Sequence, residues 1–307
     1  MKILITGHTG FIGRTLCERL TRRQKHHVVG VSADDAPTKA DRAYTCDVRD
    51  LSDLHRIFAA EAPDLVIHLA AVARGPVPAA REERTRSVNV AGAVNVAHAA
   101  RDNRCRGLIH FSTARVWGLT TSPEGRSEDA SPAPGDNLGK MALEAEQKLL
   151  EDFNDGSFPV VVLRPVTVFG KGDERGGCAK IIAALQRGFF PLLDGGAARR
   201  SLLHAENLAD RVERLIDKGW KGGATYGVSD FNVSLCDFTA LVKEHCRFAL
   251  TPAVPLSLAG HLQVLDRYLS PLLPVETPVA DAIARMSTDF VIHTRLFEHD
   301  YGYAPRL

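Results

Sequence analysis

The chain has 307 residues, of which 45% are hydrophobic and 24% are charged, proportions that are ordinary for a globular protein. Its formal net charge of +1 excludes the broad electrostatic field that attracts nucleic acid or an anionic membrane surface. No stretch reaches the roughly 18 apolar residues needed to span a bilayer, and residues 1–11 make a poor signal peptide. We therefore expect a cytoplasmic protein that binds neither nucleic acid nor membranes.

Six cysteines are scattered along the chain without a C-x-x-C pair, and the twelve histidines show no spacing typical of a metal site. We predict no metal centre and expect the thiols to be small apolar core groups in a reducing compartment. The sequence contains no internal repeat and no low-complexity tract, so it is not a repeat protein.

Short apolar runs alternate with helical patterns through the first half of the chain. The predicted strands are residues 2–6, 27–31, 43–47, 64–70, 107–112 and 159–165. The predicted helices are residues 12–21, 51–60, 84–103 and 138–153. Several strands are continuously apolar, as expected where helices cover both faces of a parallel sheet. The alternation predicts an α/β fold with a doubly wound parallel sheet.

After Pro165 the alternation becomes less regular. Helices are predicted at residues 178–187, 206–217 and 235–246, and a strand at residues 224–229. Ser234 is a suitable N-cap for the last of these helices. Residues 252–278 hold five prolines around one apolar helical segment. We expect a first domain over residues 1–165 and a smaller C-terminal lobe over residues 166–307, with residues 203–222 returning to the first domain.

Three glycines follow one another at three-residue spacing between the first predicted strand and the first helix. In that context one glycine permits a tight turn, another lets the backbone approach a pyrophosphate, and the third lets the helix pack on the strand. The N-terminus of the helix then faces the anion. A glycine-rich turn without a ligand is the alternative. The pattern predicts a dinucleotide site formed by Gly7, Thr9, Gly10, Phe11, Ile12 and Gly13.

The end of the second strand normally places an acidic side chain on the adenosine ribose, but Ser32 occupies that position. A serine hydroxyl can bond either a ribose hydroxyl or a phosphate, so it does not separate NAD from NADP. Asp34 and Asp35 would repel a 2′-phosphate close to them, and solvated loop positions are their alternative. A 2′-phosphate would be attracted by Arg14, Arg22 or Arg23. The balance favours NAD weakly over NADP.

Further segments carry a resemblance to a known family. They are residues 46–50 (CDVRD), 68–71 (HLAA), 89–96 (NVAGAVNV), 112–118 (STARVWG), 163–170 (LRPVTVFG), 200–204 (RSLLH), 207–210 (NLAD) and 301–306 (YGYAPR). Together with the glycine loop, they resemble the extended short-chain dehydrogenase/reductase superfamily, and within it the NAD-dependent epimerase/dehydratase proteins that act on nucleotide sugars. The resemblance covers nearly the whole chain and implies a Rossmann fold, an NAD(P) cofactor and a nucleotide-sugar substrate.

The resemblance also implies residues that line the cofactor. Asp47 and Val48 belong to the segment whose acid contacts the adenine in the family, and merely ending a strand is the alternative for Asp47. The stretch along the cofactor after the fourth strand corresponds to Leu69, Ala70 and Ala71. Small residues at the carboxyl end of a parallel strand leave room for a flat ligand, although plain core packing is the alternative. We expect His68 to be a satisfied strand-end histidine and Asn89 to bond backbone.

Three other residues are assigned toward the substrate by the resemblance. Thr113 supplies the hydroxyl of the active-site strand end, and Thr167 lies at the entry to the substrate lobe. Arg200 corresponds to the arginine that holds the substrate diphosphate. A planar guanidinium suits phosphate oxygens, and a surface salt bridge is the alternative role for this arginine.

The active site implied by the resemblance departs from the family at one position. The family uses a tyrosine four residues before a lysine: the phenol moves a proton of a sugar hydroxyl, and the ammonium lowers the phenol's pKa and holds the nicotinamide ribose. Lys140 matches the lysine because Glu144 follows at the family's usual spacing. Asp136 stands where the tyrosine is expected, and no tyrosine occurs between Tyr44 and Tyr226.

A carboxylate is shorter than a phenol, and a neighbouring ammonium favours its charged form, which makes Asp136 a weak acid near neutrality. This aspartate either works through a water or simply pairs with Lys140. Dehydratases of the family need acidic groups just after the threonine. Ala114 and Arg115 stand there instead, which counts against dehydration.

Two functions are left open by these residues. The first is an NAD(P)-dependent epimerase or reductase acting on a nucleotide-activated sugar, with Thr113, Lys140 and Asp136 as the catalytic set. The second is a cofactor-binding sensor or assembly protein of the same fold with little or no turnover. The predicted helices at residues 84–103 and 138–153 are long enough to pair across a two-fold axis, so a homodimer is a further expectation.

Overall fold

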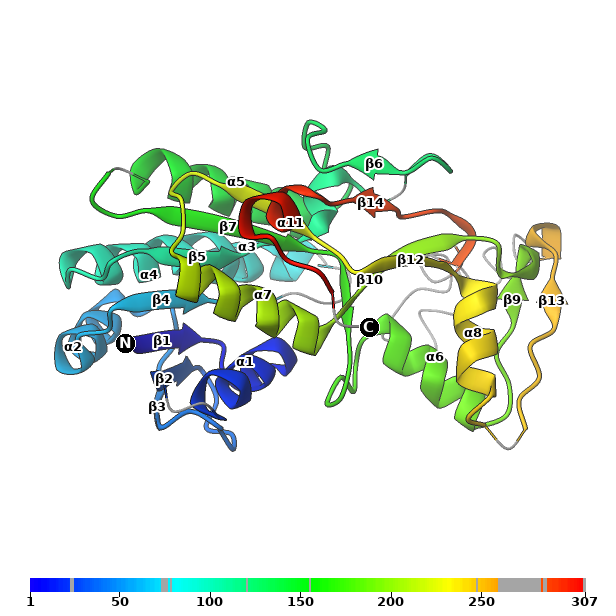
Figure 1. Cartoon of the computed structure of the whole chain (residues 1–307), viewed down its shortest axis with the longest axis horizontal. Helices are drawn as coiled ribbons and strands as arrows, with labels where there is room; N and C mark the ends of the chain where they lie inside the picture. Colours follow the sequence, from blue (N-terminus) through cyan, green and yellow to red (C-terminus); the bar gives the residue numbers. More distant parts are fainter. Residues whose placement is uncertain are drawn as a thin grey trace.

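The fold is described by a computed structural model that covers residues 1–22, 25–72, 77, 79–119, 121–154, 156–246, 248–258, 283 and 286–305. Its centre is a seven-stranded parallel sheet in the order β11-β7-β5-β4-β1-β2-β3 (Figure 1). The strands are β1 (Lys2–Thr6), β2 (His27–Ser32), β3 (Arg42–Thr45), β4 (Leu65–His68), β5 (Leu108–Phe111), β7 (Val160–Pro165) and β11 (Thr225–Val228). The predicted doubly wound sheet is confirmed, and its strand order reverses between β1 and β4, where such sheets bind ligands.

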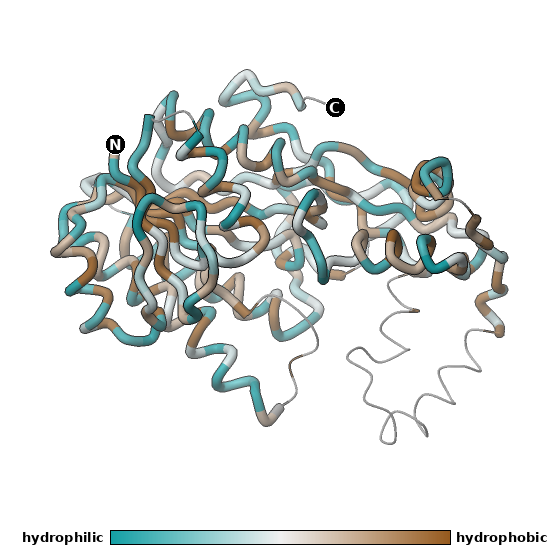
Figure 2. The backbone as a smooth tube through the Cα atoms, turned by 90° about the horizontal axis from the view of Figure 1, so that it is seen from below, coloured by the Kyte–Doolittle hydropathy of each residue, from teal (hydrophilic) through white to brown (hydrophobic). Residues whose placement is uncertain are grey.

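Two helical layers cover the sheet. One apolar cluster lies beneath α1 (Phe11–Arg22), α7 (Ala205–Lys218) and α11 (Leu296–Tyr301). The other lies beneath α2 (Leu51–Glu61), α4 (Gly92–Asp102) and α5 (Asn137–Asp152). Figure 2 shows the result as apolar strands in the middle of the molecule. Burial on both faces is the reason why the inner strands are mainly apolar, whereas the edge strand β3 is largely exposed.

The structure confirms a helix within the predicted residues 84–103, but its first residue and its regularity differ from the prediction. The helical stretch begins earlier, at α3 (Ala79–Arg86), and contains a π-helical turn over Ser87–Ala91 before α4. Gly92 follows the turn, and a Cβ there would lie 2.6 Å from the Val48 Cγ2 atom. The close approach of α4 to this loop therefore needs a glycine.

The C-terminal half forms a smaller sheet in the order β12-β10-β8. Its strands are β8 (Thr167–Phe169), β10 (Arg199–His204) and β12 (Phe231–Ser234), none of which was predicted. Short strand pairs join β9 (Leu192–Leu193) to β13 (Ala253–Val254) and β6 (Arg126–Ser127) to β14 (Ile292–His293). The remaining helices are α6 (Gly177–Gln186) and α8 (Leu235–Lys243), and the predicted N-cap is confirmed because Ser234 Oγ accepts from the Asp237 nitrogen at 3.0 Å.

The assignment of residues 203–222 to the first domain stays a prediction, and within this range lies helix α7. It packs on α1, where the Arg19 guanidinium pairs with Asp210 and Glu213 of α7. The domain boundary at residue 165 and the homodimer stay predictions. Most of the proline-rich segment, residues 259–282, lies outside the described residues. Within the described part of the chain, no helix is long and apolar enough to cross a membrane.

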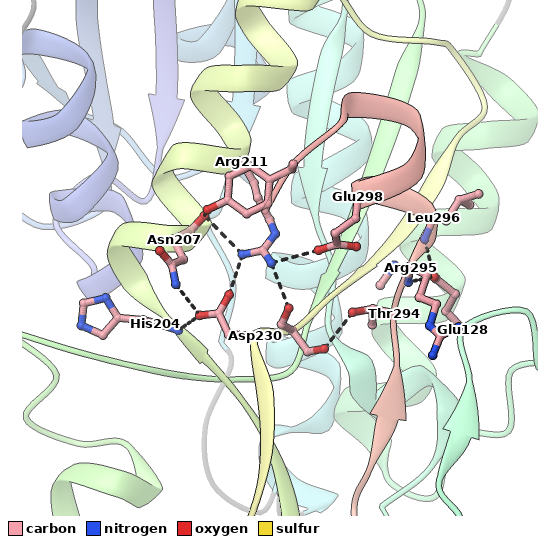
Figure 3. Close-up of polar contacts among 12 residues, drawn as sticks. Glu128, His204, Asn207, Arg211, Asp230, Thr294, Arg295, Leu296 and Glu298 are labelled. Carbon is pink, nitrogen blue, oxygen red and sulfur yellow. Dashed lines mark hydrogen bonds and ion pairs between the residues drawn. The ribbon is translucent and has the colours of Figure 1, made fainter. Parts of the chain in front are cut away.

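A buried arginine joins the C-terminal segment to the main sheet (Figure 3). The Arg211 side chain is fully buried, and its guanidinium donates to Asp230 at 2.7 Å, to Glu298 at 3.0 Å and to the Ser229 carbonyl at 2.9 Å. The Tyr303 ring covers it, with 4.3 Å between the guanidinium carbon and the ring centroid. One cation thus holds together α7, the turn between β11 and β12, and α11.

Arg211→Met should destabilise the protein by about 3–5 kcal/mol, because it leaves the buried Asp230 carboxylate without its cation. Chemical denaturation measures the change. Arg214→Met is the matched control: within the described part of the chain its guanidinium bonds the Tyr301 and Gly302 carbonyls and no carboxylate, so the expected cost is about 1 kcal/mol. Adding Asp230→Leu to Arg211→Met should recover part of the loss. Equal costs for the two single variants would contradict this account.

Candidate active site

The glycine loop forms the turn that a dinucleotide pyrophosphate requires. Gly7 has a φ of +71°, and a Cβ there would lie 2.8 Å from the Ala70 nitrogen. A Cβ on Gly13 would overlap the Gly7 carbonyl oxygen. Both glycines are therefore required by the backbone. Gly10 is exposed at the start of α1, so the first-turn amides of this helix are open to an anion.

The loop lies against the end of β4. The Leu69 and Ala70 nitrogens donate to the Thr6 hydroxyl at 3.2 and 3.3 Å, which holds this strand end beside the glycine turn. Leu69 and Ala70 are half-buried, and Ala71 is exposed. The structure thus brings together the glycine loop and the stretch predicted to run along the cofactor.

The end of β2 contacts the same loop through two side chains. The Thr9 hydroxyl lies 3.0 Å from the Ser32 hydroxyl and donates to the Asp34 carboxylate at 2.9 Å. The sequence alone places Asp34 only in a loop, where its carboxylate would repel a nearby 2′-phosphate. Its position two residues after the strand end was the available signal. The structure brings an exposed carboxylate to the edge of the glycine loop.

Contacts with a neighbouring arginine and with backbone groups position the residues that are expected near the adenine. Asp47 is half-buried, and the Arg49 guanidinium, which bonds it at 2.6 Å, holds the pKa of that carboxyl below its usual value. Val48 is buried against α4, and its carbonyl accepts from Asn95 at 3.1 Å. Asn89 bonds both backbone groups of Val72, at 2.7 and 3.0 Å, which confirms the expected structural role.

His68 is buried at the end of β4, as expected for a structural histidine. Its Nδ1 atom lies 2.7 Å from the Thr6 hydroxyl, and its ring stacks on His110 with centroids 5.4 Å apart. Burial lowers the pKa of His68 well below its ordinary value and that of His110 from 6.5 to about 4. The two rings are therefore neutral at neutral pH and are suited to the core rather than to proton transfer.

The end of β5 carries two hydroxyls with different surroundings. Thr113 is half-buried and caps the short helix over Ala114–Trp117, with its Oγ1 atom accepting from the Arg115 nitrogen at 3.3 Å. Ser112 donates instead to the buried Glu146 carboxylate. Because β4 and β5 are neighbours in the register His68↔His110, Thr113 and residues 69–71 leave the sheet at the same edge.

Glu146 is the centre of a buried ion pair that the sequence analysis missed. The Arg164 guanidinium donates to its two oxygens at 2.6 and 3.1 Å and lies 4.8 Å from the Trp117 ring. Glu146 is 1% exposed, so its charge is compensated entirely by these partners. The available signal was a second acid, two residues after Glu144, on a helix that must pack on the sheet.

Asp136 and Lys140 are not paired through their side chains in any contact of the described residues. Asp136 caps α5, where one carboxylate oxygen accepts from the Gly139 nitrogen at 2.8 Å and the other pairs with Arg115. Lys140 is exposed, and its backbone nitrogen bonds the Asp136 carbonyl. Glu144 also lies at the surface, bonded to Arg86 at 3.1 Å.

Thr167 and Arg200 lie on the same face of the smaller sheet. Thr167 pairs with Leu202 across β8 and β10, and Arg200 lies two residues before Leu202 on the same strand. Paired residues, and residues two apart on one strand, point to the same side of a sheet. Both Thr167 and Arg200 are half-buried.

Comparison with known proteins identifies the family of the chain. The sequence model of the NAD dependent epimerase/dehydratase family matches residues 3–233. The chain therefore belongs to the NAD-dependent epimerase/dehydratase family. It is 32% identical to a UDP-glucose 4-epimerase of Vibrio cholerae, over 74% of this chain and 70% of that protein.

A second curated relative covers the full length. The 2-alkyl-3-oxoalkanoate reductase of Stenotrophomonas maltophilia is 30% identical, over 100% of this chain and 96% of that protein. Among solved structures, the Bordetella bronchiseptica enzyme WbmG in complex with NAD and UDP has the same fold, with a TM-score of 0.76 at 22% identity over 99% of this chain and 89% of that one. The relatives are thus epimerases and reductases, and NAD(P) is the cofactor of this family.

Gly10→Val should weaken NAD binding by an order of magnitude or more, because its branched side chain occupies the space through which the pyrophosphate approaches the loop. Titration calorimetry gives the dissociation constant, and circular dichroism shows whether the variant is folded. A folded Gly10→Val variant with unchanged affinity would refute the placement of the pyrophosphate.

The buried histidine pair predicts how stability depends on pH. A depressed folded-state pKa means that the stabilisation is complete above the unfolded value of 6.5 and is lost as the pH falls toward about 4. For each histidine that stays unprotonated in the folded state, the free energy of unfolding rises by about 1.4 kcal/mol per pH unit over that window. His110→Phe should weaken the dependence of the free energy of unfolding on pH, measured by urea denaturation between pH 4 and 8. His245→Gln, at an exposed histidine, should not. Identical curves for His110→Phe and the parent would contradict the assignment.

Proposed function

We propose that the chain binds NAD(P) together with a nucleotide-activated sugar and belongs to the epimerase or reductase branch of its family. The observation that carries this proposal is the common edge of the sheet, where the glycine loop, residues 69–71 and the Thr113 hydroxyl come together. A dinucleotide on the loop would extend along residues 69–71 toward Thr113, whose hydroxyl is suited to bond a sugar hydroxyl. When bound, NAD(P) supplies the acceptor or donor of a hydride.

The substrate class is supported by the lobe and by the relatives. Arg200 and Thr167 lie on one face of the β12-β10-β8 sheet, and a guanidinium there is suited to the diphosphate of a sugar nucleotide. The curated relative from Vibrio cholerae is named for UDP-glucose, and WbmG was solved with UDP. These names support a nucleotide-sugar substrate for this chain.

A preference for NAD over NADP is supported by Asp34. The carboxylate is held by Thr9 at the end of β2, where the adenosine ribose is expected in this fold. A negative charge there repels a 2′-phosphate. Of the arginines that could attract one, Arg14 reaches the Gly172 carbonyl at 3.4 Å and Arg22 pairs with Glu18, while residue 23 lies outside the described residues.

A second function, cofactor binding with little or no turnover, is favoured by the surroundings of Asp136. Its two carboxylate oxygens are occupied by the cap of α5 and by Arg115. An acid–base catalyst must reach the reacting hydroxyl directly or through one water. A carboxylate committed to two structural contacts is poorly suited to that task.

Arg200→Ala should weaken binding of UDP-sugars by about 10–100-fold, because a charge-assisted hydrogen bond to phosphate is worth roughly 1.5–3 kcal/mol. Thermal shifts of the NAD-loaded protein with UDP-glucose and other sugar nucleotides identify the ligand, and calorimetry then compares the variant with the parent. NAD affinity is the internal control and should not change. Loss of both ligands, or of neither, would rule out the role of Arg200, and absence of a shift with every sugar nucleotide tested on the parent would reject the substrate class.

A further inference from the structure

Helix α5 presents two stripes of side chains at four-residue spacing, and they face opposite ways. Asp136, Lys140 and Glu144 form one stripe, in which Lys140 is exposed and Glu144 is half-buried and pairs with Arg86. The other stripe contains Leu138, Ala142 and Glu146. Residues four apart share a helix face, whereas residues two apart lie on opposite sides.

The second stripe is the one that faces the end of β5. Glu146 bonds Ser112 there, next to Thr113. Leu138 is 5% exposed, and Ala142 packs against the core cluster beneath α1 and α7. The start of α5 packs closely on the short helix that follows β5, since a Cβ on Gly139 would lie 2.8 Å from the Arg115 carbonyl oxygen.

The family pattern of tyrosine, then lysine, then glutamate at four-residue spacing fits α5 in two registers. One ends at Glu144, and the other ends at Glu146. Only Glu146 is buried at the end of β5, so the contacts select the second register. We infer that Leu138 and Ala142 occupy the positions of the catalytic phenol and ammonium, and that this chain holds its ligands beside an apolar face of α5 without a proton-transfer pair.

This inference rests on the proposed function and specifies how its site behaves. Oxidation of a sugar carbinol breaks the C–H bond, sends the hydride to the nicotinamide, and requires a base for the hydroxyl proton. Leucine and alanine side chains cannot accept that proton, and among the described residues the Thr113 hydroxyl contacts the Arg115 backbone nitrogen rather than a base. The chain therefore binds NAD and sugar nucleotide with much slower turnover than a site that carries the pair.

Restoring the pair tests the inference directly. In the double variant Leu138→Tyr/Ala142→Lys, the phenol takes the hydroxyl proton and the ammonium lowers the phenol's pKa. Oxidation or epimerisation of the UDP-sugar that binds the parent should rise by about 10²-fold or more. The gain should increase with pH as the phenol ionises. The matched control is Asp136→Tyr, which creates the same spacing with Lys140 on the outer stripe and should give no gain.

A binding measurement gives a second test that does not depend on turnover. Ala142 is half-buried, so a lysine there can extend toward the nicotinamide ribose. Ala142→Lys alone should tighten NAD binding about tenfold, the effect of one charge-assisted hydrogen bond. Lys140→Ala should leave the NAD dissociation constant unchanged because that side chain is exposed on the other stripe. This pair of variants decides the register even if the larger Leu138→Tyr change prevents folding.

Several outcomes would overturn the inference. One is a gain of activity in Asp136→Tyr together with weaker NAD binding in Lys140→Ala, since both would assign the outer stripe to the site. Another is a fast parent enzyme that loses activity in Asp136→Asn. A folded double variant that binds both ligands and stays inert would also reject it. A parent that binds neither NAD nor any UDP-sugar would instead reject the proposed function.

Discussion

The buried ion pair between Glu146 and Arg164 is the constraint on which the geometry of the candidate active site depends. Both side chains are nearly inaccessible to water. Among the described residues their charges compensate each other, while the Ser112 hydroxyl bonds Glu146 and Arg164 lies over the Trp117 ring. A rotation of α5 about its axis would leave two unpaired charges in the core. The pair therefore holds the helix in one rotational setting, and that setting decides which side chains reach the end of β5.

The main sheet could be predicted from the sequence because its strands are buried on both faces by the helices of the same βαβ units. The smaller sheet could not. Its strand β10 (Arg199–His204) begins with two arginines and is buried only over residues 201–203, and its partners β8 and β12 come from distant parts of the chain. A strand whose partners are distant in sequence and whose pattern is partly polar gives no local periodicity to detect.

Within the site, too, a part could be predicted where its structural requirements are local in the sequence and not where they depend on distant residues. The glycine loop could be predicted because its requirements are local: Gly7 needs a positive φ, and Gly13 lies against the turn that precedes it. The facing stripe of α5 could not be predicted, because a helical period allows Glu144 and Glu146 equally well. The contacts of Glu146 with Ser112 and Arg164, which lie 34 and 18 residues away in the sequence, select between them.

These observations show how the fold separates binding from chemistry. The cofactor loop is shaped by the backbone and by glycines, whose replacement would clash with Ala70 or with the loop itself. Proton transfer in this fold depends instead on side chains of one helix face, which the backbone does not require. An apolar residue at position 138 or 142 packs against its neighbours without an unpaired charge. Stability therefore places no constraint on keeping a phenol and an ammonium there, whereas it does constrain the ligand-binding loop and the ion pair that orients the helix.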